Sequence, residues 1–244
     1  MIKYINNKKT KTILLLHGLA CDISYFDTLI EIMGTEYNIL LPKLFGHYKE
    51  SKNDFTILEE CENICEYCII NNITINIIIA HSMSSILSFY IDKKINSIEN
   101  IYLLEGNIIE EDFGWSSQIS SMTNNEFKKY WDKFQKQYPL ILKMKLKNKL
   151  DLIKYTTTIL DIDGCGIYQY ARLISEYKEN LNIFDSSFPK IIYFESNKSK
   201  YIDKKKILSK KYNFKLELIA NTSHYMMIDV PNIISNAIKE KNDS

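Results

Sequence analysis

Ser82 stands in a sequence context that suits a catalytic nucleophile. It lies within IAHSMSS (79–85), between an apolar run and a helix-like pattern, with the small residues Ala80 and Ser84 two positions before and after it. A tight turn from strand to helix has no room for large side chains at these positions, and it holds the central serine in strained backbone geometry. A serine between small residues is also a common helix cap. The segment therefore predicts either a nucleophile for acyl transfer or a cap.

The four histidines, His17, His47, His81 and His224, all lie at or just beyond the end of a predicted strand. His224 follows the last apolar run and precedes the final helix-like pattern. A neutral imidazole is the natural base for a serine hydroxyl at pH 7. We therefore expect His224 to be the base, and we expect His17 and His47 to be structural residues that bond nearby backbone groups.

The strands expected to position these residues are short, continuous runs rich in Ile and Leu. Such runs are typical of strands buried on both faces of a parallel sheet, and the helix-like patterns between them indicate helices on both sides. Ligands bind at the carboxyl ends of such strands, where Ser82 and the histidines lie. The predicted strands are Ile13–Leu16, Tyr37–Leu41, Ile75–Ala80, Asn100–Leu104, Lys190–Phe194 and Phe214–Ile219. The predicted helices are Ser24–Met33, Phe55–Asn71, Ser84–Lys93 and Pro231–Lys239.

The alternation of strands and helices is interrupted once, by a mostly helical segment rich in aromatic residues. We predict that residues 107–187 form a helical cap over one end of the sheet, and that residues 1–106 and 188–244 form one α/β core. Phe127, Tyr130, Trp131 and Phe134 recur at helical spacing. Most of them are expected to pack within the cap, and some to line a pocket.

The order of these motifs resembles that of the α/β-hydrolase superfamily over nearly the whole chain. The matching features are the turn HGL (17–19), the segment GHYKES (46–51), the serine turn, the helical insertion and the late histidine. The chain departs from the usual pattern in three places: Ala80 and Ser84 replace the glycines around the nucleophile, and Lys43 replaces an aspartate. The resemblance implies an α/β-hydrolase fold and a serine hydrolase with a catalytic triad.

The resemblance also implies an oxyanion hole made by two backbone N–H groups. In this superfamily one comes from the loop after an early strand, which here is Leu19, and the other from the residue after the nucleophile, which here is Met83. Such groups stabilise the negative charge that develops on the substrate oxygen.

The acid of the triad has two main candidates. Most members of the superfamily carry it after the strand that follows the cap, where this chain has Glu195. Several branches, haloalkane dehalogenases among them, place a glutamate after the strand before the cap, where this chain has Glu105, 23 residues beyond Ser82. A carboxylate directly after a buried strand needs a partner, and a histidine N–H would supply it. We favour Glu105 over Glu195, with Asp203 and Asp112 as further alternatives.

The composition is that of a globular protein: 244 residues, 45% of them hydrophobic, with a formal net charge of +1. A dedicated binder of nucleic acid or of anionic membranes would carry a basic surplus. The N-terminus has no apolar run of signal-peptide type, and no stretch approaches the roughly 20 apolar residues of a membrane span. We expect a cytoplasmic protein with a small-molecule substrate and no membrane span.

Three of the five cysteines, Cys61, Cys65 and Cys68, have a spacing that also occurs in iron–sulfur proteins. The surrounding sequence is helical, however, and steps of four and three place these thiols on one helix face. Buried free cysteine behaves as a small hydrophobic residue, so we expect a packing role. An odd number of cysteines suits a reducing compartment. No metal and no organic cofactor are expected.

The sequence thus predicts a serine hydrolase that acts on an ester or thioester of an apolar small molecule. Haloalkane dehalogenation is excluded, because that chemistry needs an aspartate where this chain has Ser82. The alternative is a non-catalytic protein of the same fold that binds a small molecule or serves as a partner subunit.

Overall fold

The computed structural model describes residues 1–49, 52, 54–148, 152–162, 164–177 and 190–242. They form a seven-stranded sheet in the order β1-β3-β2-β4-β5-β6-β7, in which β1 is antiparallel to β3 and all other neighbours are parallel. The strands are β1 (Ile2–Ile5), β2 (Thr12–Leu16), β3 (Asn38–Pro42), β4 (Ile77–His81), β5 (Asn100–Leu104), β6 (Lys190–Ser196) and β7 (Lys215–Ile219). The predicted α/β class with a mostly parallel sheet is confirmed.

The central strands are built from the apolar runs. Every residue of β2, β3, β4 and β5 is buried, as expected for strands covered on both faces. The register aligns the carboxyl ends of β2, β4 and β5, because Leu16 pairs with Ala80 and His81 pairs with Leu104. The turns that follow these three strands therefore meet at one edge of the sheet, and this edge carries the candidate site.

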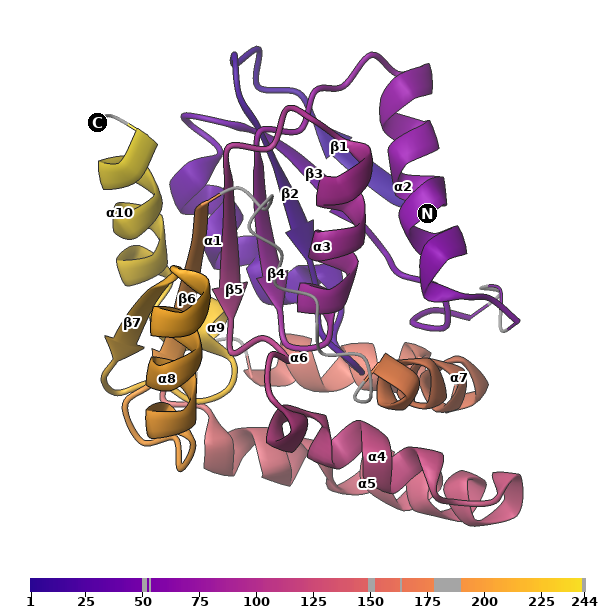
Figure 1. Ribbon diagram of the computed structural model, residues 1–244. Helices are drawn as coiled ribbons and strands as arrows, with labels where there is room; N and C mark the ends of the chain where they lie inside the picture. Colours follow the sequence, from indigo (N-terminus) through magenta and orange to yellow (C-terminus); the bar gives the residue numbers. More distant parts are fainter. Residues whose placement is uncertain (50–51, 53, 149–151, 163, 178–189, 243–244) are drawn as a thin grey trace.

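Helices cover both faces of the sheet. Helix α1 packs against α10 and α2 packs against α3, and Figure 1 shows these two pairs on opposite sides of the sheet. The helices are α1 (Asp27–Met33), α2 (Ile57–Ile70), α3 (Ser84–Lys94), α4 (Gly114–Ser120), α5 (Asn124–Lys145), α6 (Leu152–Thr158), α7 (Gly164–Tyr177), α8 (Ile202–Tyr212), α9 (Met226–Asp229) and α10 (Pro231–Asn242). The described residues also contain three short 3-10 helices: η1 (Ile23–Phe26), η2 (Glu110–Phe113) and η3 (Ile159–Asp161).

The segment predicted as a cap contains only helices in its described parts, residues 107–148, 152–162 and 164–177. Helices α4 to α7 lie together beyond the carboxyl end of the central strands (Figure 1). The longest of them, α5, begins with a capping box in which Thr123 and Glu126 bond each other's backbone N–H groups. The division of the chain into a core and a cap stays a prediction, and residues 178–189 lie outside the described residues.

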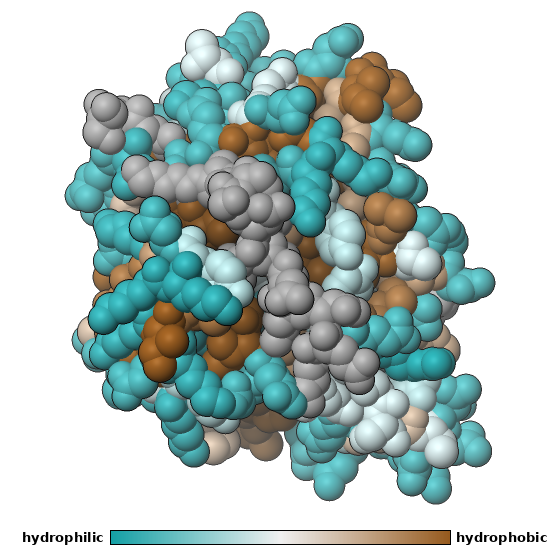
Figure 2. Space-filling model, in the orientation of Figure 1, coloured by the Kyte–Doolittle hydropathy of each residue, from teal (hydrophilic) through white to brown (hydrophobic). Residues whose placement is uncertain are grey.

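Outside the predicted cap, the structure adds strand β1, helix α8 and the short helix α9 to the strands and helices that the sequence predicts. Strand β1 and helix α8 are at or near the edges of the molecule, where burial produces little pattern. Cys61, Cys65 and Cys68 lie on the buried side of α2. Within the described residues, no helix is long and apolar enough to cross a membrane. On the face shown in Figure 2, hydrophilic residues predominate and apolar residues form separate patches.

Candidate active site

Ser82 occupies the turn between β4 and α3 with a φ of +54°, a left-handed conformation that is unusual for a residue with a side chain. Two backbone hydrogen bonds fix this turn to the end of β5: Ser82 N donates to Leu104 O at 3.0 Å, and Asn107 N donates to Ser82 O at 3.2 Å. Met83, not Ser82, is the N-cap of α3, and no side chain caps that helix. Strain of this kind is typical of functional sites, and the interpretation of Ser82 as a helix cap finds no support.

The small residues on either side of Ser82 are both fully buried. Ala80 lies in β4 between β2 and β5. The Ser84 hydroxyl donates a hydrogen bond to the carbonyl of His17, which ties the start of α3 to the turn after β2. The serine that replaces a glycine therefore connects the serine turn to the turn that contains Leu19.

Glu105 and His224 are hydrogen-bonded at this edge, with Oε2 of Glu105 2.7 Å from Nδ1 of His224. Glu105 follows β5 directly and has a φ of +44°. Its other oxygen, Oε1, accepts a hydrogen bond from the Ser196 amide at 3.1 Å. Burial would raise the pKa of Glu105, but the hydrogen bond and charge of His224, the Ser196 amide and the charge of Lys205 outweigh it, so the pKa lies below its usual value.

An ionised carboxylate can only accept hydrogen bonds, so Nδ1 of His224 must carry the proton in this contact. The other ring nitrogen, Nε2, is then an unprotonated acceptor when the ring is neutral. This is the tautomer that a general base requires. The backbone carbonyl of His224 accepts a hydrogen bond from Nε2 of His81 at 2.9 Å, so a second histidine holds the main chain of the same turn.

His81 has a structural role that the sequence does not indicate. It is fully buried, and burial lowers its pKa well below the usual value, so the ring is neutral. Because Nε2 donates to a carbonyl, Nδ1 carries no hydrogen, and among the described residues it has no partner. A Cβ on Gly18 would lie 2.6 Å from this nitrogen, so the glycine leaves the space that the ring occupies. His81 therefore joins three segments: the Gly18 turn, the Ser82 turn and the His224 turn.

The Leu19 turn is supported by two buried histidines that accept reciprocal hydrogen bonds. Nε2 of His17 accepts from the Leu44 amide, and Nε2 of His47 accepts from the Ala20 amide, each at 3.2 Å. Their rings meet edge to face, with centroids 4.8 Å apart. Burial lowers the pKa of both rings, which keeps them neutral and able to accept. Both histidines therefore have the structural positions expected of them.

The amide N–H groups predicted to form an oxyanion hole belong to Leu19 and Met83. Within the described part of the chain, neither N–H donates to a protein acceptor. The Leu19 side chain lines the same cavity as Ser82. Met83 is not among the residues that line the cavity, and the role of both N–H groups in an oxyanion hole stays a prediction.

The other acidic candidates have different partners. Glu195 is 2% exposed and accepts a hydrogen bond from Nζ of the buried Lys205 at 2.8 Å. Asp112 is 2.9 Å from the same Lys205 nitrogen. Asp203 is almost fully exposed and pairs with Lys206 on α8. Of these four carboxylates, Glu105 is the one that the structure places against His224.

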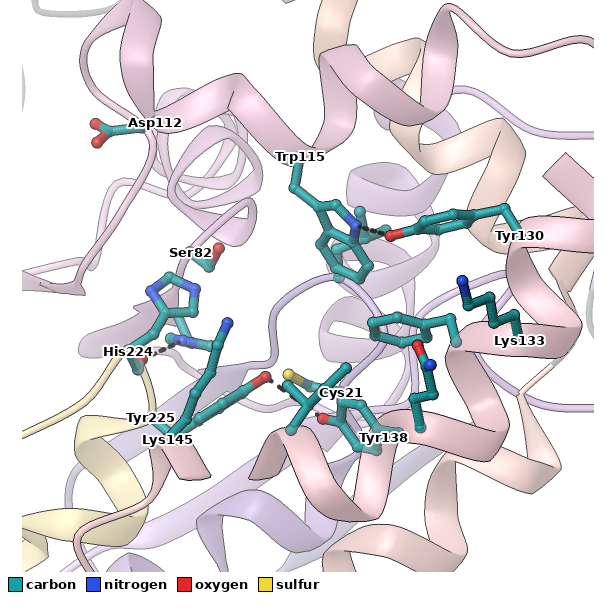
Figure 3. A pocket seen from close by; sticks show the side chains of 15 residues that line it. Cys21, Ser82, Asp112, Trp115, Tyr130, Lys133, Tyr138, Lys145, His224 and Tyr225 are labelled. Atoms are coloured by element: carbon teal, nitrogen blue, oxygen red, sulfur yellow. Dashed lines mark hydrogen bonds between the residues drawn. The ribbon is translucent and has the colours of Figure 1, made fainter. Parts of the chain in front are cut away.

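A cavity of about 630 Å³ opens in front of this cluster and is lined by Ser82, His81 and His224 on one side. Figure 3 shows the Ser82 hydroxyl and the His224 ring at one end of it, with Trp115 and Tyr130 across from them. Nε1 of Trp115 donates to the Tyr130 hydroxyl at 2.8 Å. Helix α5 supplies much of the opposite wall, so some of the predicted cap aromatics do line a pocket. The α5 residues in this wall are Tyr130, Lys133, Phe134, Gln137, Tyr138, Ile141 and Lys145.

Asp229 links the His224 turn to α5, and no motif in the sequence indicates this role. Oδ2 of Asp229 accepts from the Ser223 amide at 2.7 Å. Oδ1 accepts from the amides of Lys147 and Asn148, just beyond the C-terminus of α5, at 2.7 and 2.9 Å. One carboxylate therefore fixes the base-bearing turn relative to the helix that forms the cavity wall.

No group of three or more His, Cys, Asp or Glu side chains that could hold a metal ion occurs within the described ranges of the chain. Burial raises the pKa of the Cys61, Cys65 and Cys68 thiols, which is the state expected of cysteines that pack as hydrophobic residues.

Comparison with known proteins identifies the fold. No protein-family model and no curated protein matches the sequence. A thermophilic esterase from Thermogutta terrifontis (malate bound) superposes with a TM-score of 0.72 and 13% identity, covering 100% of this chain and 92% of that chain. MenH from S. aureus superposes with a TM-score of 0.75 and 14% identity, covering 98% of this chain and 96% of that chain. The 1H-3-hydroxy-4-oxoquinoline 2,4-dioxygenase superposes with a TM-score of 0.79 and 14% identity, covering 98% of this chain and 95% of that chain. Sheet order and these superpositions agree, and the protein has the α/β-hydrolase fold.

Proposed function

We propose that this protein is a serine hydrolase that cleaves an ester or thioester of an apolar small molecule through an acyl-enzyme on Ser82. The observation that carries the proposal is the 2.7 Å hydrogen bond between Nδ1 of His224 and Oε2 of Glu105, beside the cavity that Ser82 also lines. A half-buried carboxylate that fixes the tautomer of a histidine, in a cavity that a strained serine also lines, is the arrangement that acyl transfer requires.

The reaction begins when Oγ of Ser82 attacks the substrate carbonyl and Nε2 of His224 takes the hydroxyl proton. The carbonyl oxygen becomes an oxyanion, which accepts hydrogen bonds from the Leu19 and Met83 amides. His224 then gives its proton to the departing alcohol or thiol, and the acyl group stays on Ser82. Water attacks this ester with the same proton transfers and releases the acid. Glu105 stays ionised and stabilises the imidazolium that forms.

The preference for an apolar substrate rests on the cavity wall. Aromatic rings from α4 and α5, among them Trp115, Phe134 and Tyr138, line the cavity. Apolar burial contributes about 25 cal/mol per Å² of ligand surface, so these rings favour an aliphatic or aromatic group. Similar walls occur in small-molecule sites generally.

The fold alone does not select hydrolysis, since one of the structures with this fold is a 2,4-dioxygenase. The test is turnover of p-nitrophenyl butyrate by the wild type and by Ser82→Ala, each with and without dissolved oxygen. Ser121→Ala is the matched control, because Ser121 is exposed, directly follows α4, and donates its hydroxyl to the carbonyl of Gln118 in that helix. We expect hydrolysis that is independent of oxygen, lost in Ser82→Ala and kept in Ser121→Ala.

Two results would contradict the proposal. Oxygen-dependent turnover would indicate oxygenation chemistry in the same cavity. Unchanged hydrolysis in Ser82→Ala, or no hydrolysis of any ester or thioester by the wild type, would favour the non-catalytic alternative, a binding protein with the fold of an enzyme.

A further inference from the structure

The cavity has three charged side chains in its lining, Asp112, Lys133 and Lys145. The charge of Asp112 is already compensated: it lies 2.9 Å from Lys205 and accepts hydrogen bonds from the Ile108 and Ile109 amides at 3.0 Å. Among the described residues, no carboxylate pairs with either Lys133 or Lys145. In the part of the chain that the structure describes, the lining therefore carries two positive charges with no paired carboxylate, on a wall of mostly aromatic and aliphatic residues.

The two lysines lie at opposite ends of the α5 face that lines the cavity. They are separated by twelve residues, which is about 18 Å along a helix axis. Figure 3 shows Lys145 extending from the last turn of α5 toward the wall that holds His224, and Lys133 on the side of Tyr130. Lys145 thus reaches the reactive end of the cavity, whereas Lys133 lies at the far end.

The position of Lys145 relates to one part of the substrate. In the proposed mechanism His224 protonates the departing alcohol or thiol, so the leaving group must lie against the His224 ring. An ammonium group that extends to the same wall faces the leaving group more directly than it faces the acyl group. A positive charge in a partly enclosed cavity raises the local concentration of anions and binds a carboxylate by charge-assisted hydrogen bonds.

We infer that the natural substrate carries a negatively charged group on its alcohol or thiol portion, and that Lys145 is the residue that selects it. This inference rests on the proposed hydrolase function. It narrows the substrate class from apolar esters in general to esters or thioesters in which an apolar acyl group is joined to an anionic leaving group.

The test compares 3-acetoxybenzoate, whose leaving group is an anion, with its neutral methyl ester. The measured quantity is the ratio of kcat/KM for the acid to kcat/KM for the methyl ester. This ratio is compared between the wild type and each variant, because the difference in chemical reactivity between the two substrates is the same for both enzymes and cancels. Lys145→Met should lower the ratio by about fivefold, the upper size of an ion pair made by an exposed lysine. Lys145→Glu should lower it further, and added salt should lower it in the wild type.

Lys143→Met is the matched control. Lys143 lies in the same last turn of α5 and is exposed like Lys145, but it does not line the cavity. We expect the ratio for this variant to equal that of the wild type. A parallel pair, p-nitrophenyl hemiglutarate and its methyl ester, places the anion on the acyl group, and Lys145→Met should change that ratio less.

Binding of the product 3-hydroxybenzoate, measured by calorimetry against methyl 3-hydroxybenzoate, separates this inference from the proposed function. Tighter binding of the acid that depends on Lys145 supports the anion site even if Ser82 proves inert. Equal binding of the two compounds, or an anion preference that Lys145→Met leaves unchanged, overturns the inference even if ester hydrolysis is found. A preference that appears only with the acyl anion and depends on Lys133 overturns it as well.

Discussion

Glu105 follows β5 and Glu195 lies near the end of the neighbouring strand β6, and the two carboxylates differ in the side chain that each one contacts. The Glu195 carboxylate is neutralised by Lys205, whose pKa is raised because the attraction of Asp112 and Glu195 outweighs the burial that would lower it. Glu105 faces His224 and the Ser196 amide. Because Glu195 is held by its ion pair with Lys205, it is not oriented toward His224. Of the two carboxylates, Glu105 is the one that is hydrogen-bonded to His224.

The first prediction follows from these contacts. Glu105→Gln should lower kcat by about a hundredfold or more, because an amide favours the wrong tautomer of His224 while leaving its position intact. Glu195→Gln and Asp203→Asn should each lower kcat by less than about tenfold. These two carboxylates pair with Lys205 and Lys206, so neither sets the tautomer of His224. The measurement is kcat for p-nitrophenyl butyrate per mole of folded enzyme.

Unfolding in urea supplies the control for these variants. Glu195→Gln should reduce the free energy of unfolding by about 3 kcal/mol, because it breaks a buried ion pair with Lys205. Asp203→Asn should have little effect, since Asp203 is exposed. A crippling loss of kcat in folded Glu195→Gln, with a mild effect of Glu105→Gln, would assign the acid to β6 instead.

The second prediction concerns pH and the buried histidines. The folded protein lowers the pKa of His17, His47 and His81 by burial, so the unfolded chain binds more protons just below pH 6.5. The stability that these rings contribute is therefore complete above pH 6.5 and is lost as the pH falls below it. Each ring contributes a slope of about 1.4 kcal/mol per pH unit in that window.

Three carboxylates act in the opposite direction. Burial raises the pKa of Glu60 to about 7, that of Asp92 to about 6 and that of Asp112 above its usual value, so the folded protein holds protons that the unfolded chain has released. The test is therefore a difference: urea unfolding of the wild type and of His47→Gln between pH 8 and pH 5. The free energy of unfolding of His47→Gln should fall less steeply on acidification than that of the wild type. The difference in slope should correspond to about one proton fewer taken up on unfolding. Parallel curves for the two proteins would show that His47 is not held neutral.

At the scale of elements, α7 rests on the turn that contains His47 through a contact between two glycines. Gly46 has a φ of +70°, and a Cβ on Gly166 would lie 2.0 Å from the Gly46 Cα. Tyr170, one turn further along α7, donates a hydrogen bond to Glu60 on α2 at 3.0 Å. Because His47 supports the Leu19 turn through Ala20, this contact connects a helix of the predicted cap to the candidate oxyanion hole.

The third prediction tests this contact. Gly166→Ala should reduce the free energy of unfolding by about 2 kcal/mol, because backbone atoms of two elements must separate. Gly114→Ala is the control: a Cβ on Gly114 would have no atom within 4 Å, and alanine has the higher helix propensity, so stability should stay equal or rise by up to about 1 kcal/mol. A tolerated Gly166→Ala would show that α7 can shift away from the Gly46 turn without cost.

The elements themselves were predictable to different degrees. The buried strands lie within two residues of the predicted bounds, because a strand covered on both faces is apolar throughout. Strand β1 is a short edge strand and only partly buried, so its four residues carry no comparable signal. Helix α8 carries lysines on most of its surface, and one of them, Lys205, is its buried residue. A buried lysine reverses the usual hydrophobic pattern.

At the scale of the whole molecule, the sequence predicted which residues lie together at one edge of the sheet. It did not predict the ion pairs and hydrogen bonds that join separate elements around them. Parallel strands end at one edge, so Ser82, Glu105 and His224 could be placed together from the ends of apolar runs. The pairing of Lys205 with Glu195 and the link from Asp229 to the end of α5 depend on how α8 and α9 pack. No sequence motif connects these partners, because their contacts arise only from the packing of separate elements.

The central claim is that Ser82 is an activated nucleophile, and the most direct measurement is labelling by a fluorophosphonate followed by intact-mass and peptide analysis. The wild type should gain one phosphonyl group at neutral pH, located on Ser82, while Ser82→Ala should gain none and keep the circular-dichroism spectrum of the wild type. Labelling should also slow strongly in His224→Ala, because the hydroxyl loses its base. A wild type that is not labelled, or a label found on another residue and kept in Ser82→Ala, would contradict the account.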